Sequence, residues 1–187
     1  MAVRTRALRK TTLPDKKSDK KSDNKSDKKS DKKSNKMSDK NSDDPPWYLN
    51  RQRKIRFDES EFRTFLQRLS REVARGREFA VVVGSDDALR RANRAYRGKR
   101  STTDVLSFPD GDDGRLGDIL ISAGRARQQA ERFDHRIEDE FKVLVLHGVL
   151  HLLGYDHETD NGRMRRAETR WRRKFGLPAG VVERVEQ

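Results

Sequence analysis

One long apolar stretch, residues 137–153, limits the folds open to this chain more than any other part of it. From Val143 onward the stretch is apolar on nearly every face of a helix, and Gly154 then ends it. A helix that is apolar all round is buried inside a domain. The pattern therefore predicts a central buried helix with other elements packed around it.

Three of the chain's four histidines accompany this helix with H-x3-H-x5-H spacing: His147, His151 and His157. The first two are one helical turn apart, so their rings project from one face. Gly154 can adopt a left-handed conformation and let the chain reverse, which can bring His157 back to the same point. A single histidine on an apolar helix is usually a core residue. Three at this spacing favour a metal site with an open fourth position, which is typical of catalytic zinc.

The residue after His147 bears on the reaction. Zinc peptidases with this spacing carry a glutamate there as general base, and this chain has Gly148. Peptide hydrolysis would lack its proton acceptor, whereas a metal could still polarise a phosphoryl oxygen. The chain has no cysteine, which excludes a closed thiolate site, but imidazole also binds nickel, copper and iron. Arg97 could bind phosphate through the paired N–H donors of its guanidinium group. The alternative is that Arg97 is an ordinary surface arginine.

Hydrophobic periodicity and turn residues place the other elements around the central helix. Together they predict an α+β fold: a small mixed β-sheet with packed helices, in which the central buried helix carries the metal motif. The expected strands are 53–57, 79–83, 105–108 (stopped by Pro109) and 116–122. The other expected helices are 60–73, 84–96, 124–133 and a basic one over 159–175.

The first 46 residues differ in composition from the rest of the chain. Residues 17–44 repeat Lys, Ser and Asp with one apolar residue, Met37, so they cannot bury enough surface to fold. We expect a disordered basic tail over residues 1–46 and a single domain over 47–187. The tail holds 15 Lys or Arg against 8 Asp, which is +7 of the formal net charge of +13.

Both parts are therefore basic, which suits a polyanionic partner such as nucleic acid about as well as it suits a merely soluble surface. The tail could add salt-sensitive attraction to RNA, but its alternating Asp residues favour a solubilising extension. No apolar run reaches the length of a membrane span, and no signal-peptide core is present. The expectation is a cytoplasmic protein without a membrane partner.

Three stretches together resemble the YbeY family of bacterial rRNA-maturation endoribonucleases. They are HGVLHLLGYDH (147–157), AYRGKRSTTDVLSFP (95–109) and LGDILIS (116–122), within a likeness over about residues 50–175. The resemblance implies a single-domain metallohydrolase fold in which His147, His151 and His157 hold one zinc ion. It also implies that Arg97 and His147 are catalytic, with Arg97 contacting RNA phosphate, and that the cleft is lined by Thr103, Asp104, Ser107 and Phe108.

The resemblance further implies cleavage of single-stranded RNA, with roles in 16S rRNA 3′-end maturation and ribosome quality control. The implied partners are ribosomal RNA and ribosomal or ribosome-assembly proteins, including an Era-type GTPase. An alternative is an RNA-binding assembly factor whose zinc is mainly structural, and Gly148 disfavours a metallopeptidase. Asp156, next to His157, could orient that ring or transfer a proton, or it could be an ordinary turn aspartate.

Overall fold

The computed structural model describes residues 48–98, 103–112 and 114–185, without the side chains of residues 97, 111, 112 and 185. The expected tail, residues 1–46, lies outside the described residues. Contacts join the described part into one compact unit. Its elements in chain order are β1 (Tyr48–Asn50), α1 (Glu59–Glu72), β2 (Glu78–Gly84), α2 (Asp86–Arg97), β3 (Val105–Asp112), β4 (Arg115–Ser122), α3 (Ala123–Arg132), α4 (Ile137–Leu152), α5 (Arg163–Phe175) and α6 (Val181–Val185).

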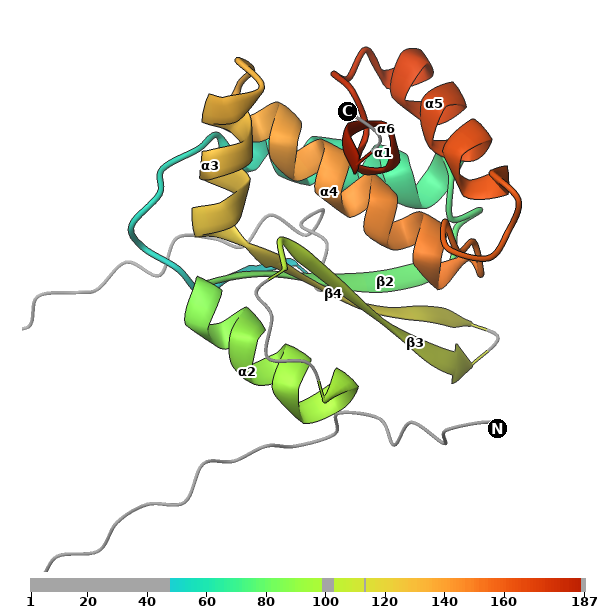
Figure 1. Cartoon of the computed structure of the whole chain (residues 1–187), viewed down its shortest axis with the longest axis horizontal. Helices are drawn as coiled ribbons and strands as arrows, with labels where there is room; N and C mark the ends of the chain where they lie inside the picture. The colour runs from blue at the N-terminus through green and yellow to red at the C-terminus, as the bar shows by residue number, and fades with distance from the viewer. Residues whose placement is uncertain (1–47, 99–102, 113, 186–187) are drawn as a thin grey trace, which may run out of the picture. The chain divides into compact units, whose positions relative to one another are not determined.

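The strands form one mixed sheet with the order β1-β2-β4-β3. β1 and β4 both run parallel to β2, and β3 is antiparallel to β4. Figure 1 shows α2 on one face of this sheet and the other helices on the opposite face, with α4 crossing directly over the strands. The prediction of an α+β fold with a small mixed sheet and packed helices is confirmed.

The helix α4 is the centre of the core. Its apolar side chains are almost fully buried against the sheet and the surrounding helices, including Phe141, Leu144 and Leu150. Ser107 of β3 donates a hydrogen bond to the carbonyl of Gly148 at 3.2 Å, which records how closely the helix approaches the sheet. Burying such a stretch is the largest favourable contribution to folding, and it fixes in place whatever side chains α4 carries.

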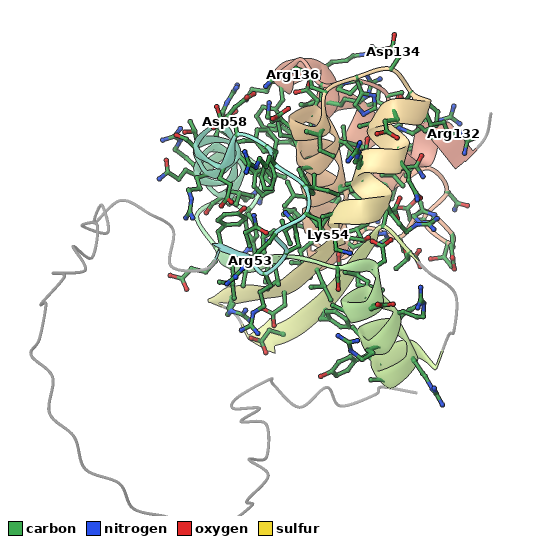
Figure 2. All side chains as sticks on the ribbon, turned by 90° about the vertical axis from the view of Figure 1, so that its left-hand side faces the viewer. Arg53, Lys54, Asp58, Arg132, Asp134 and Arg136 are labelled. Atoms are coloured by element: carbon green, nitrogen blue, oxygen red, sulfur yellow. The ribbon has the colours of Figure 1, made fainter. Side chains whose placement is uncertain are left out.

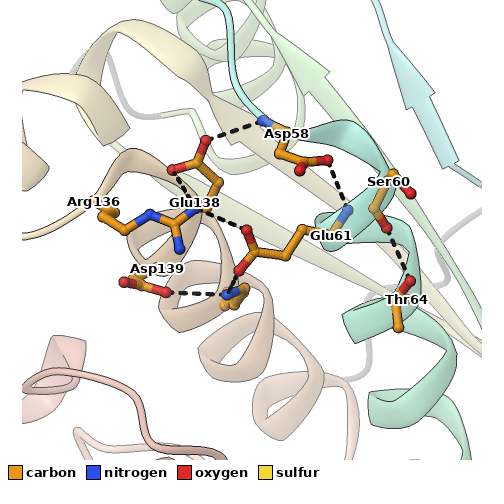
Figure 3. A network of polar contacts seen from close by, with 8 residues as sticks. Asp58, Ser60, Glu61, Thr64, Arg136, Glu138 and Asp139 are labelled. Atoms are coloured by element: carbon orange, nitrogen blue, oxygen red, sulfur yellow. Dashed lines mark hydrogen bonds and ion pairs between the residues drawn. The ribbon is translucent and has the colours of Figure 1, made fainter.

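The first turn of α4 is tied to α1 by ion pairs (Figure 3). Glu61 of α1 accepts from Lys142 at 2.5 Å and from Arg136 at 2.8 Å. Asp139 also accepts from Lys142, and Glu138 accepts from the backbone N–H of Asp58, which caps α1. These contacts join two helices that are far apart in the sequence.

The predicted strand over 53–57 is wrong, and the edge strand is β1 instead. The Gln52 side chain accepts from the N–H groups of Lys54 and Ile55 and donates to the Ile55 carbonyl. These bonds satisfy the backbone locally, so the segment turns and does not pair with the sheet. Figure 2 shows Arg53 and Lys54 along this segment, which reaches Asp58 at the start of α1.

Two other boundaries differ from the prediction. β3 continues through Pro109 to Asp112. Proline has no backbone N–H to donate, but β3 is an edge strand, so the N–H that Pro109 lacks is not needed for pairing. α5 begins at Arg163 and not at Thr159, because Asn161 and Gly162 have left-handed φ values of 53° and 75°, which a right-handed helix cannot include. Within the described part of the chain, no helix has the length and apolar character needed to cross a membrane.

Candidate metal centre

The three predicted histidines lie together at the C-terminal end of α4. His147 and His151 project from the helix, and the reversal at Gly154, which has a φ of 85°, brings His157 beside them. One ring nitrogen of each lies within 4.8 Å of the others. The ring centroids are 4.7 to 5.6 Å apart. His147 is buried and His157 is exposed, so the cluster opens to solvent on one side.

Hydrogen bonds fix which nitrogen of two rings carries the proton. Nδ1 of His147 lies 2.9 Å from Oε1 of Glu168, and Nδ1 of His151 lies 3.0 Å from the Tyr155 carbonyl oxygen. A carboxylate and a carbonyl only accept, so each Nδ1 donates and each Nε2 bears a lone pair. These two Nε2 atoms lie 3.1 Å apart. Two facing lone pairs repel each other in neutral rings and are stabilised by a shared cation, so the donor set is suited to a metal ion.

The electrostatic setting keeps His151 neutral. Burial lowers the pKa of His151 to about 4, and the nearby His147 and His157 rings add to the shift. A neutral imidazole is the form that ligates a metal. The ring is therefore ready to bind a cation at neutral pH without first releasing a proton.

Glu168 is a site residue that the sequence analysis missed. It lies on α5 with 1% of its surface exposed, and its second oxygen accepts from the N–H of Val182 at 3.1 Å. A carboxylate behind a metal-binding histidine fixes the ring orientation and raises its basicity. One signal could have revealed it: Glu168 is the only acidic residue on α5 and lies one turn from Met164, on the apolar face of that helix.

The structure also accounts for Gly148, which stands where a peptidase has its glutamate. A Cβ atom there would lie 3.0 Å from two carbon atoms of Ile119 and 3.1 Å from Oγ of Ser107. The space belongs to the contact between α4 and the sheet, so a longer side chain would require the Ile119 and Ser107 side chains to move. The absence of a peptidase base is thus built into the packing.

Asp156 has the contacts of a turn residue. Its carboxylate accepts from the Thr159 hydroxyl at 2.8 Å and from the Glu158 N–H at 3.1 Å. The Thr159 hydrogen bond is the largest cause that lowers the pKa of Asp156, and the neighbouring histidines contribute less. These contacts hold the 156–160 turn that presents His157, so Asp156 acts on the site through the backbone.

The residues expected to line a cleft are only partly gathered near the histidines. Ser107 is buried against Gly148, one residue from His147. Phe108 packs edge-on against Tyr96 of α2 with centroids 5.1 Å apart. Thr103 and Asp104 bond to the backbone around Val105, where β3 begins. Asp104 also lines a pocket of about 220 Å³ formed with α3 and α6.

Arg97 is the last residue of α2, and its side chain lies outside the described residues. Gly98 follows it with a φ of 65° and ends the helix. The contact between Arg97 and phosphate therefore stays a prediction.

A mixed sheet beneath a buried helix that presents three converging histidine nitrogens defines an α+β metalloprotein of the metallohydrolase type. The family model "Endoribonuclease YbeY" matches residues 48–176 of this chain. The chain therefore belongs to the YbeY endoribonuclease family, which confirms the family predicted from its sequence.

Two endoribonuclease relatives agree with this assignment. The chain is similar to endoribonuclease YbeY of Solibacter usitatus, with 57% identity over 122 residues that cover 65% of this chain and 82% of the relative. For endoribonuclease YbeY of Koribacter versatilis the identity is 43% over 127 residues, or 68% and 84% of the two chains. The solution structure of TM1509 from Thermotoga maritima is 25% identical, covers 66% of this chain and 84% of that one, and has a TM-score of 0.49.

Proposed function

We propose that this protein is a metal-dependent endoribonuclease that cleaves single-stranded RNA at the histidine cluster. The observation that carries the proposal is the convergence of three histidine nitrogens within 4.8 Å in a chain that belongs to an endoribonuclease family. Three protein ligands leave a position open for water or substrate, whereas structural sites are usually closed by four. The open side, at the exposed His157, is where RNA would enter.

Zinc is the proposed ion, held by His147, His151 and His157 as one site. When bound, it would polarise a phosphoryl oxygen and lower the pKa of a water molecule bound to it to about 7. The protein's own part is to hold the ligands. Glu168 orients His147, the Tyr155 carbonyl orients His151, and the Asp156 turn positions His157. Arg97 is proposed to stabilise negative charge on the phosphate.

The proposed biological role is 16S rRNA 3′-end maturation and ribosome quality control in the cytoplasm. The proposed partners are ribosomal RNA, the ribosome and ribosome-assembly proteins such as an Era-type GTPase. The support for this role is membership of the family together with a basic chain of net charge +13, which suits RNA. Thr103, Asp104, Ser107 and Phe108 are proposed to shape the substrate cleft.

The test is cleavage of single-stranded RNA by wild type, His147→Ala, His157→Ala and Arg97→Ala, with the metal content of each preparation measured. We expect each histidine variant to lose metal and at least about 100-fold in cleavage rate, because a three-ligand site has no spare ligand. Arg97→Ala should keep its metal and lose about 10²–10³-fold, as removal of one charge-stabilising group does.

His157→Ala is the safer of the two histidine variants, because His157 is exposed and its loss leaves no cavity in the core. Equal cleavage by all four proteins would overturn the proposed activity. RNA binding that persists under that outcome would support the alternative, an RNA-binding assembly factor whose metal is mainly structural.

A further inference from the structure

The exposed face of α5 carries a row of arginines that the proposed cleavage site does not use. Seven of the thirteen α5 residues are Arg or Lys, against one acid, Glu168. Met164, Ala167 and Glu168 face the interior. Spacings of three and four residues place the outward arginines on one helix face. We call them the arginine strip: Arg163, Arg166, Arg170 and Arg173, all exposed.

The strip differs from the basic residues at its borders in how its charge is balanced. Arg172 pairs with Glu183 at 2.9 Å, and Lys174 pairs with Glu72 at 2.8 Å. In the described part of the chain, no strip arginine forms an ion pair with a carboxylate. Arg166 donates to the Asn161 carbonyl, and Arg163 lies 5.9 Å from the Tyr155 ring centroid. Like charges at this spacing destabilise a helix, so the strip suits an anionic partner.

Two grooves run along the strip, and one of them is lined in part by Tyr155, a residue that also contacts the metal centre. The first, of about 380 Å³, is lined by Tyr155, Ala167 and strip residues up to Arg170. The second, of about 520 Å³, shares Arg166 and Arg170 and continues to Arg173. Tyr155 lies next to the site as well, because its carbonyl accepts from Nδ1 of His151. Figure 1 shows α5 beside the C-terminal end of α4, where the histidines lie.

We propose that the arginine strip binds the phosphates of the RNA strand that enters or leaves the metal centre. This inference rests on the proposed function and adds a surface to it. Guanidinium groups bind phosphate through paired donors, and six of the seven basic residues on α5 are arginine. From Arg163 to Arg173 the strip spans about 15 Å, which is long enough to contact several phosphates.

The test measures binding of a fluorescein-labelled single-stranded RNA of about 20 nucleotides by anisotropy over a range of salt concentrations. The test variant is the zinc-loaded full chain with Arg166→Gln, Arg170→Gln and Arg173→Gln. The matched control removes the same charge from exposed arginines of α1 and α2, with Arg71→Gln, Arg90→Gln and Arg91→Gln. Metal content and urea unfolding of both triple variants verify that the fold and the site are intact.

We expect the Kd for RNA of the strip variant to be roughly 10- to 100-fold higher than that of wild type at about 0.1 M salt. The slope of log K against log salt concentration should become less steep by about 2, because three phosphate contacts are lost and each contributes about 0.7 on a single strand. The control should shift both quantities much less. Cleavage at saturating RNA should be unchanged in the control variant, because its three substitutions lie outside both the histidine cluster and the strip.

Equal weakening by the two triple variants would overturn the strip proposal, since the effect would then be one of net charge alone. Equal binding by wild type and the strip variant would overturn it as well. Either result, with cleavage still lost in His157→Ala, leaves the proposed activity standing. The converse result is also possible: the strip variant binds RNA more weakly than the control, but no cleavage depends on His157. That result would support the strip proposal and overturn the proposed activity.

Discussion

The two ends of α4 both gather titratable side chains, but they arrange them in opposite ways. At the first turn, unlike charges meet: Glu140 accepts from Arg184 at 2.8 and 2.9 Å and contacts His135 at 2.7 Å, and Glu61 bridges Lys142 and Arg136. At the C-terminal end, the imidazoles of His147, His151 and, after the reversal, His157 bring like donor atoms together. Groups that satisfy each other hold a fold, whereas groups that converge without satisfying each other suit a ligand.

Glu168 lies where the two kinds of arrangement meet. It binds His147 as an ionic partner would, and its other oxygen binds the backbone of α6. The same carboxylate thus serves the site and the packing of α5 and α6 against α4. The difference between the two ends can be tested, because substitutions at the first end should change stability and those at the last end should change metal binding.

The largest stability effect is expected at Glu140, which is fully buried against Arg184. Glu140→Ala leaves the guanidinium of Arg184 buried without its partner, which costs about 3–5 kcal/mol in the free energy of unfolding. Urea unfolding measures this quantity. The folded variant should still bind metal with wild-type stoichiometry.

Glu131→Ala is the matched control, because Glu131 forms a similar ion pair with Arg127 but is exposed. Its cost should stay under about 1 kcal/mol. If Glu140→Ala cost no more than Glu131→Ala, burial would not be what makes the first-turn ion pairs strong. The comparison between the two ends of α4 would then lose its basis.

The next largest effect is expected at Glu168, on metal affinity. Glu168→Gln keeps the shape of the side chain but removes its charge, so the His147 ring is held less firmly and is less basic. Loss of such a partner costs about 10- to 100-fold in metal affinity. Competition with a chromophoric chelator measures it. Unchanged affinity, with unfolding shifted instead, would assign Glu168 to packing alone.

The outcome at these residues shows what a sequence of this kind can predict. The grouping of the histidines follows from local geometry, one helical turn and one glycine reversal, and it could be predicted. The part played by Glu168 could be predicted only in outline: its place on the apolar face of α5 marks it as buried, but its partner lies 21 residues away on another helix. The misplaced edge strand has a similar cause, since the Gln52 side chain competes with sheet pairing and hydrophobic alternation does not reveal that. The reason for Gly148 appears only in its distance to Ile119.

The smallest effect is expected at Glu61, on the way the free energy of unfolding depends on pH below neutrality. Hydrogen bonds from Lys142 and then Arg136 hold the pKa of Glu61 below its ordinary value of 4.5. A carboxylate with a lowered pKa stabilises the fold above its unfolded pKa, and that contribution is lost as pH falls through the folded pKa. Glu61→Gln should therefore cost up to about 1 kcal/mol near neutral pH, discounted for its partial exposure, and less at about pH 3, below the ordinary pKa of the carboxyl group.

Urea unfolding of wild type and Glu61→Gln at both pH values measures this difference. Repeating the pair in an Arg136→Gln background, where one of the two partners is gone, should make the difference smaller. A difference that stays the same at both pH values would mean that Glu61 contributes by shape and not by charge. In that event the first turn of α4 would not be held by unlike charges at this position, and the contrast with the histidine end would rest on Glu140 alone.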